Sequence, residues 1–225
     1  MAAGAGLSGR KALNLRRLGL FLMVAVGSVF FWLTPALYPL KIFVVFIHET
    51  GHALATVLTG GRVLAMVVTP WESGYVQYRG GSPLLIASAG YVGSALFGAI
   101  MLLLSGREKW STKVFGGLAF LFGVVTIGFV CNVFGITFGL GTAAVFGGLA
   151  WKRFPGAHYI IDVLAVMSTL YALYDLSDFL LIGAKTDAVI LAQMTHIPAF
   201  FWAILWSAVS LLVVYMAGKQ TLTRG

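Results

Sequence analysis

Apolar runs, interrupted by short segments that carry most of the basic residues, are the dominant pattern along this chain of 225 residues. Helices of about 20 apolar residues are long enough to cross the hydrocarbon core of a bilayer. The uncharged stretch 114–151 is too long for one crossing and fits two, with a tight turn near 132–135. The pattern predicts an all-α multi-pass membrane protein with six or seven transmembrane helices, at about 18–37, 40–58, 83–104, 114–151 (two helices), 157–183 and 199–217.

The segment 62–81 differs from these runs, because it is rich in β-branched and aromatic residues and is interrupted by Thr69-Pro70 and Ser73-Gly74. This composition predicts a β-hairpin or a re-entrant loop after the second helix. Non-helical backbone at membrane depth is tolerated only where it is buried in protein or lines a wet cavity. We therefore expect 62–81 to pack beside the helix at 40–58.

Composition supports this fold class, since 60% of the residues are hydrophobic and only 10% are charged. We expect a basic tail at 1–17, one transmembrane domain at 18–217 and a C-terminal tail at 218–225, in an integral protein of the plasma membrane. The net charge of +8 lies mostly between apolar runs, so it favours contact with the lipid bilayer over nucleic-acid binding. The single cysteine, Cys131, excludes a disulfide within the chain.

The distribution of basic residues bears on the orientation of the chain in the membrane. Arg10, Lys11, Arg16 and Arg17 favour a cytoplasmic N-terminus. In a seven-helix arrangement, however, the basic residues at 107–113 and 152–153 would then face outward. Either the number of crossings differs by one or the N-terminal charges decide the orientation.

The motif HETGH at 48–52 lies inside the second apolar run. On a helix, His48 and His52 are four residues apart and share one face, so both imidazoles can bind one Zn²⁺ ion. Glu49 projects beside the metal, where it can take a proton from a coordinated water whose pKa zinc lowers to about 7. Ionisable residues inside a membrane helix are costly and are mostly functional. The motif therefore predicts a catalytic site with one zinc ion per chain.

A catalytic zinc ion usually has three protein ligands, so we looked for a third among the acids. Asp175 lies closest in depth to the motif if the helix at 157–183 is centred near residue 170, whereas Asp162 and Asp178 lie farther from the midplane. Asp178 could support Asp175 or replace it. Asp187 could cap a short helix or reach the site from the connecting segment. Asp175 is the predicted third ligand, and a buried acid bonded to a tyrosine is its alternative.

Small residues recur at helical spacing in the run at 83–104. Gly90, Ser94 and Gly98 are four residues apart, and such positions let membrane helices approach closely. We interpret them as packing positions.

Five stretches together resemble the compact B-like branch of the site-2 protease family of intramembrane zinc metallopeptidases. They are HETGHALATVLTGGRV, GYVQYRGG, SAGYVGSALFGA, YALYDLSD and TDAVILAQMTHIPAFFWAILW, in this order within 40–206. The resemblance implies zinc ligands at His48 and His52, a catalytic base at Glu49, and an aspartate ligand from a later helix, which falls on Asp175. It also implies that the hairpin holds an extended substrate. The chain lacks the Asp-Gly pair that is typical of the family's aspartate stretch.

These observations predict an intramembrane zinc metalloprotease that hydrolyses a peptide bond in a membrane-embedded or juxtamembrane protein. Two alternatives remain open at this point. One is a membrane protein with a structural or regulatory zinc site, and the other is a small proton or metal transporter that uses Glu49, Asp175 and Asp178.

Overall fold

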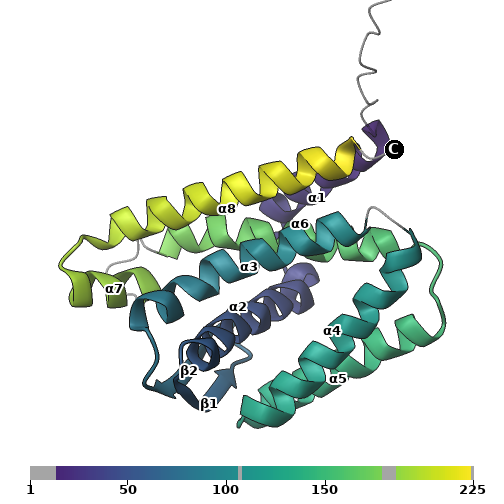
Figure 1. Ribbon diagram of the computed structural model, residues 1–225. Helices are drawn as coiled ribbons and strands as arrows, with labels where there is room; N and C mark the ends of the chain where they lie inside the picture. Colours follow the sequence, from purple (N-terminus) through teal and green to yellow (C-terminus); the bar gives the residue numbers. More distant parts are fainter. Residues whose placement is uncertain (1–13, 106–107, 179–185, 224–225) are drawn as a thin grey trace, which may run out of the picture.

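The computed structural model describes residues 14–105, 108–178 and 186–223, without the side chains of 108–109 and 171–178 (Figure 1). The chain forms helices around a two-stranded sheet. In order, the elements are α1 (Leu15–Phe31), a 3₁₀ turn η1 (Pro35–Leu37), α2 (Tyr38–Leu58), β1 (Arg62–Val68), β2 (Gly74–Arg79), α3 (Pro83–Ser105), α4 (Glu108–Phe129), α5 (Val133–Trp151), α6 (Ala157–Asp178), α7 (Asp187–Thr195) and α8 (Ala199–Leu222).

Five helices of the described chain are long and apolar enough to cross a membrane, namely α2 with η1, α3, α4, α5 and α8. The apolar part of α6 whose side chains are described, Ala157–Leu170, is shorter. Together with the small sheet, these helices confirm the predicted class of an all-α membrane protein with a hairpin. The turn between α4 and α5 lies next to the position expected near 132–135.

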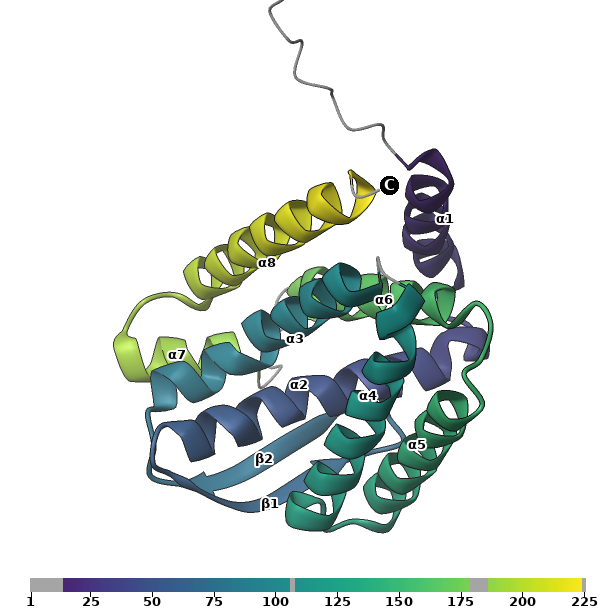
Figure 2. The same ribbon diagram turned by 45° about the vertical axis from the view of Figure 1, so that its right-hand side comes forward.

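The helix α2 forms the centre of the bundle. Residues 41–50 are all buried, because α3, α6 and the hairpin surround this helix (Figure 2). A helix that is apolar on every side is stable only in such surroundings. The motif at 48–52 is therefore held on an element that neighbouring elements contact from several directions.

The segment 62–81 forms the predicted β-hairpin, with an antiparallel register that pairs Arg62 with Arg79 and Val68 with Gly74. Its tip is attached to the start of α2 by two contacts. The Tyr38 hydroxyl donates to the Pro70 carbonyl over 2.9 Å. The Lys41 ammonium donates to both carboxylate oxygens of Glu72 over 3.0 and 2.9 Å. The hairpin thus runs back along α2, as expected.

The outer edge of β1 is covered by the turn between α4 and α5. The Asn132 amide donates to the Val68 carbonyl over 2.7 Å and accepts from the Val68 N–H over 3.2 Å. The Cys131 N–H donates to the Met66 carbonyl over 3.1 Å. These bonds occupy the outer edge of β1 at Met66 and Val68, whereas β2 forms the opposite edge of the two-stranded sheet.

Glycines allow α3 to lie close to two neighbouring helices. A Cβ atom at Gly51 of α2 would overlap the Ala89 carbonyl of α3. A Cβ atom at Gly98 would come within 2.8 Å of the Ala165 carbonyl of α6. These contacts agree with the interpretation of the small residues in α3 as packing positions.

Candidate metal centre

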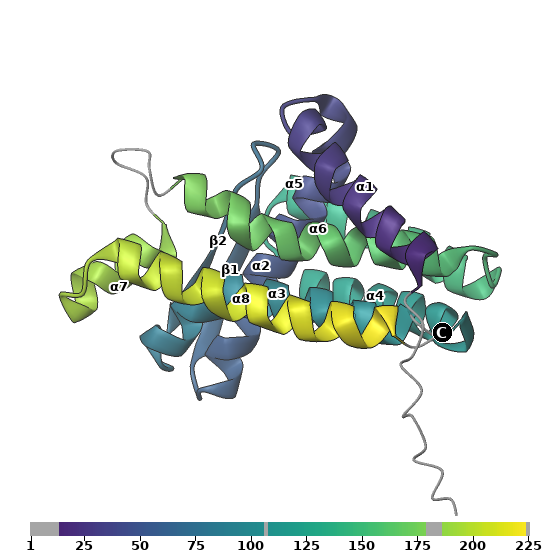
Figure 3. The same cartoon turned by 90° about the horizontal axis from the view of Figure 1, so that it is seen from above.

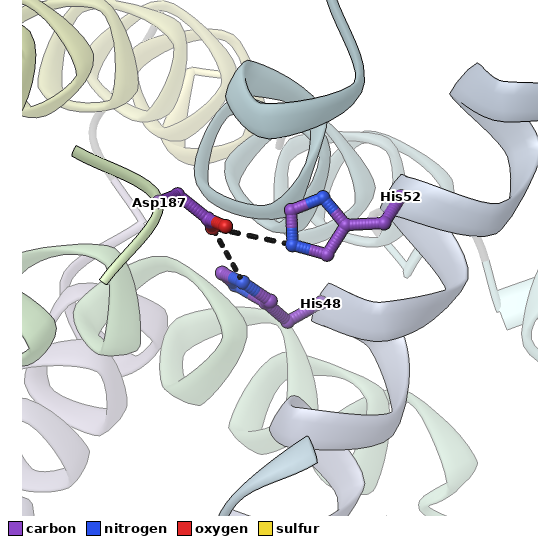
Figure 4. Close-up of side chains that lie close together, drawn as sticks. All are labelled: His48, His52 and Asp187. Atoms are coloured by element: carbon purple, nitrogen blue, oxygen red, sulfur yellow. Dashed lines mark hydrogen bonds and ion pairs between the residues drawn. The ribbon is translucent and has the colours of Figure 1, made fainter. Parts of the chain in front are cut away.

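His48 and His52 lie one turn apart on α2, and their rings face a common point (Figure 4). The ring centroids are 4.7 Å apart, and the ring planes meet at 79°. Both residues are buried, with 8% and 7% of their surfaces exposed. The helical spacing of the motif therefore produces the convergence of imidazoles that metal binding requires.

Asp187, the first residue of α7, brings a carboxylate to the same point. Its Oδ2 atom lies 3.2 Å from Nε2 of His48 and 3.2 Å from Nε2 of His52. Thr186 caps α7, since its hydroxyl accepts from the Val189 N–H over 3.4 Å. The Asp187 side chain can therefore face the histidines instead of capping the helix, which were the two roles that the sequence left open.

A small apolar cluster holds α7 against the part of the bundle that carries the histidines. Ala188 and Leu191 of α7 pack with Tyr91 of α3 and Trp206 of α8. Tyr91 also meets the His48 ring edge to face at 5.0 Å and stacks on Trp206 at 4.9 Å. Docking of α7 through this cluster fixes the position of Asp187.

The hydrogen bonding of His52 indicates that a positive charge belongs between these three side chains. Its Nδ1 atom lies 2.6 Å from the Ile86 carbonyl, which can only accept, so Nδ1 carries a proton. In a neutral ring Nε2 is then an acceptor, and it faces a second acceptor, Oδ2 of Asp187, at 3.2 Å. Two acceptors are stable at this distance only with a proton or a metal ion between them.

The donor set fits zinc. Two imidazole nitrogens and a carboxylate oxygen are common zinc ligands, and bonds of 2.0–2.1 Å in a tetrahedron place ligand atoms about 3.4 Å apart. The two distances of 3.2 Å from Asp187 are close to that value. Among the described residues, His48, His52 and Asp187 form the one group of three potential metal ligands whose donor atoms all lie within 4.8 Å.

The charge of the histidines affects the pKa of Asp187, the acid that contacts both of them. Burial alone would raise the pKa of Asp187, but the charge on His52 and hydrogen bonds from both rings outweigh it and lower the pKa below its usual range. Tyr78 of β2 also lies within the field of this carboxylate, since burial and the negative charge of Asp187 raise the pKa of its phenol. The electrostatic field of Asp187 therefore extends to the hairpin.

Glu49 lies beside the histidines and under the hairpin. It is buried, with 5% of its surface exposed. A Cβ atom at Gly74, the first residue of β2, would come within 2.7 Å of Glu49 Cγ and 2.8 Å of its Oε1. The start of β2 therefore covers the carboxylate, and the absence of a side chain at Gly74 makes room for it.

Gly90 of α3 lies directly against both imidazoles. A Cβ atom there would overlap Nε2 of His48 and lie 2.6 Å from Nε2 of His52. These are the two nitrogens that face Asp187. The packing interpretation of Gly90 was therefore incomplete, because this glycine also leaves the space that a shared metal ion would need.

The structure thus brings together His48, Glu49 and His52, which the sequence singled out, and adds Asp187. Asp175 and Asp178 lie in the last turns of α6, but their side chains are outside the described residues. The assignment of Asp175 as third ligand therefore stays a prediction. His158 and His196 lie at the ends of α6 and α7 and are not among the clustered ligands of the described chain.

Fold and site together define a helical membrane protein with a buried His, His, Asp centre and an adjacent glutamate. A family model, Peptidase M50B-like, matches residues 21–217. The chain belongs to this family, which confirms the resemblance to site-2 proteases drawn from the motifs. Neither the comparison with curated proteins nor the comparison with solved structures gives a match.

Proposed function

We propose that this protein is a zinc-dependent intramembrane protease, and that His48, His52 and Asp187 hold the metal. The observation that carries the proposal is the convergence of two buried imidazoles and one carboxylate beside Glu49. Three protein ligands leave the fourth position of a tetrahedral zinc ion open, as is usual for catalytic sites. When bound, zinc polarises a peptide carbonyl and lowers the pKa of water.

Glu49 is the proposed base and then acid. Its carboxylate accepts a proton from the attacking water at Oε1 or Oε2 and then donates that proton to the leaving amine. Burial under the start of β2 keeps bulk water away from this carboxylate. His52 is held in one tautomer by the Ile86 carbonyl, so its Nε2 atom is available as a ligand.

The hairpin is the proposed site for the substrate backbone. A peptide bond within a transmembrane helix is protected by the helix's own hydrogen bonds, so it must be extended before it can be cut. An extended peptide can add to a free strand edge and satisfy its backbone groups there. Because Asn132 and Cys131 already cover β1, we assign this role to β2.

A Glu49→Gln variant tests the proposal. Glutamine keeps the size of the side chain but loses the carboxylate that moves the proton. Purified protein should retain about one zinc ion per chain, as in catalytic zinc sites generally, and should no longer cleave. The readout is metal analysis together with mass spectrometry of single-span transmembrane peptides in phospholipid vesicles.

Three results would contradict the proposal. Cleavage that persists unchanged in Glu49→Gln would exclude Glu49 as the base. Zinc bound at normal stoichiometry in a chain that cleaves none of the peptides, while His48→Ala loses both zinc and thermal stability, would favour a structural zinc site. Proton or zinc flux across the vesicles that depends on Glu49 would favour the transporter.

A further inference from the structure

Four helix ends that are far apart in sequence meet at one end of the bundle. The first residue described, Asn14, donates its N–H to the Leu222 carbonyl at the end of α8 over 2.9 Å. At the start of α1, Arg17 donates through Nε to Asp162 of α6 over 2.8 Å and through a terminal nitrogen to Ser105, the last residue of α3, over 2.6 Å. The starts of α1 and α6 and the ends of α3 and α8 therefore lie together (Figure 1).

This end is strongly basic, and we call it the basic end. It carries six basic side chains of the described residues, whereas the opposite end, at the base of the hairpin, carries two, Arg62 and Arg79. The six are Arg16, Arg17, Lys113, Lys152, Arg153 and Lys219.

Aromatic side chains accompany these charges. Trp110, Trp151, Tyr159 and Tyr215 are all exposed at the basic end. The Lys113 ammonium lies 4.5 Å from the Trp110 ring. Exposed Trp and Tyr next to Lys and Arg are typical of the interface between a bilayer and water.

The position of α1 decides how many helices cross the membrane. The helices α2 and α3 are antiparallel, since His52 meets Ile86 while His48 meets Gly90. At 1.5 Å per residue, Ser105 lies about 22 Å from Gly90 along α3, and Lys41 lies about 10 Å from His48 along α2, both toward the basic end. Arg17 at the start of α1 contacts Ser105, and Trp32 at its end has its ring 5.2 Å from the Lys41 ammonium.

Both ends of α1 therefore lie on the same side of the metal centre. A helix of 17 residues is about 25 Å long and would pass the level of the histidines if it ran along α2. Instead α1 runs obliquely to α3 and α8 across the basic end (Figure 3). The crossings are then α2, α3, α4, α5, α6 and α8, and the connections that carry the six basic residues all lie on one side of the membrane.

We propose that α1 stays within one leaflet and that the basic end faces the cytoplasm, against the anionic headgroups of the inner leaflet. Basic residues near the ends of crossing helices set orientation in this way, and anionic lipids attract them. The difficulty of the seven-helix arrangement disappears for the described residues, because Lys113, Lys152 and Arg153 no longer face outward.

The metal centre then lies in the half of the membrane nearer the outer surface. His52 is six residues from Leu58, the end of α2 opposite the basic end, which corresponds to about 9 Å along the helix. Asp187 enters from α7, which also lies at that opposite end. The orientation does not depend on the proposed protease activity, so each can fail without the other.

Cysteine accessibility tests the orientation, in a Cys131→Ala background that leaves no other thiol. Phe154→Cys reports on the basic end and Met194→Cys on α7, and both positions are exposed and uncharged. A membrane-impermeant maleimide added to intact bacterial cells should label Met194→Cys, and should label Phe154→Cys only after permeabilisation. The opposite result, or labelling of both positions from the same side, would overturn the proposal.

Two further variants test its physical cause and the position of α1. Leu33→Cys, just after α1, should not be labelled from outside intact cells; labelling there would show that α1 crosses. Replacing Lys113, Lys152, Arg153 and Lys219 by Gln should let a measurable fraction of the chains insert with Phe154→Cys outside. The matched variant Arg62→Gln with Arg79→Gln should insert as the parent does, and inversion in this control instead would refute the assigned cause.

Discussion

Oδ2 of Asp187 lies 3.2 Å from Nε2 of His48, although 139 residues separate the two in the chain. This contact joins the short helix α7 to the central helix α2 and completes a group of three potential metal ligands with His52. The neighbours of these two residues support the contact from α3, α7 and α8. Each feature leads to a measurable expectation.

The first prediction concerns the third ligand. Asp187→Asn keeps the size of the side chain but removes the negative charge, so zinc affinity should fall by more than the roughly 10–100-fold typical of losing a residue that only supports a ligand. Zinc titration in the presence of a competing chelator measures this. Asp175→Asn, the position favoured by depth along α6, is the matched control and should bind zinc as the parent does. A larger loss in Asp175→Asn than in Asp187→Asn would reverse our assignment.

The second prediction concerns Gly90. Gly90→Ala should abolish zinc binding, because the new methyl group overlaps the His48 ring and crowds Nε2 of His52 at 2.6 Å. Gly93→Ala is the control on the same helix, since the atom nearest to its new methyl group would be Gly51 Cα at an ordinary 3.6 Å. Metal analysis and helical circular dichroism should separate loss of zinc from loss of fold. Normal zinc content in Gly90→Ala would contradict the prediction, because it would show that α3 can shift and accommodate the methyl group beside the histidines.

The third prediction concerns the cover over Glu49. Gly74→Ala should lower the cleavage rate without removing zinc, because a Cβ atom there would displace Glu49 Oε1, only 2.8 Å away. The three atoms nearest to this Cβ position belong to Glu49 and Val67, so the change should act on Glu49 and not on the histidines. Single-turnover cleavage and metal content are the two measurements. In a Glu49→Gln background the added Gly74→Ala change should have no further effect on rate, and an additive loss would place its influence elsewhere.

The fourth prediction concerns the attachment of the hairpin tip. Lys41 is buried, with 5% of its surface exposed, whereas the Glu72 side chain is 34% exposed. Glu72→Ala leaves a buried charge without its carboxylate and should cost up to about 3 kcal/mol, at the low end for broken buried pairs because Glu72 is partly screened by solvent.

The matched change removes the other partner. Lys41→Met keeps an apolar stem and leaves a carboxylate that water can reach, so it should cost about 1 kcal/mol or less. Thermal unfolding in detergent compares the two variants. Equal losses in both would argue that the contact contributes only packing at the tip.

Local sequence patterns were sufficient for much of the fold. The spacing of His48 and His52 specifies one helix face, and the turn signals at Thr69-Pro70 and Ser73-Gly74 mark a hairpin, because both depend on neighbours in the chain. The long apolar helices follow from apolar length alone. These features need no knowledge of the tertiary arrangement.

Features that depend on the tertiary arrangement were harder to predict. Depth along a crossing helix favours Asp175, and it does not apply to our proposed ligand Asp187, which enters from a short helix. The pair Thr186-Asp187 held a usable signal, because a threonine cap frees the following acid for another role. Similarly, the apolar run of α1 is compatible with a crossing. Our proposal that its start and end lie in the same half rests on the contacts of Arg17 with Asp162 and of Trp32 with Lys41.

The contact between α2 and α7 also affects the stability of the fold. A cation bound by His48 and Asp187 would form a reversible cross-link between residues 139 positions apart in the sequence. Cross-links that close long loops lower the conformational entropy of the unfolded chain most. Losing the cation would weaken the attachment of α7 to α2, whereas α8 keeps its own hydrogen bonds to α3. The ion proposed to support catalysis would then also help to keep α7 on the central helix.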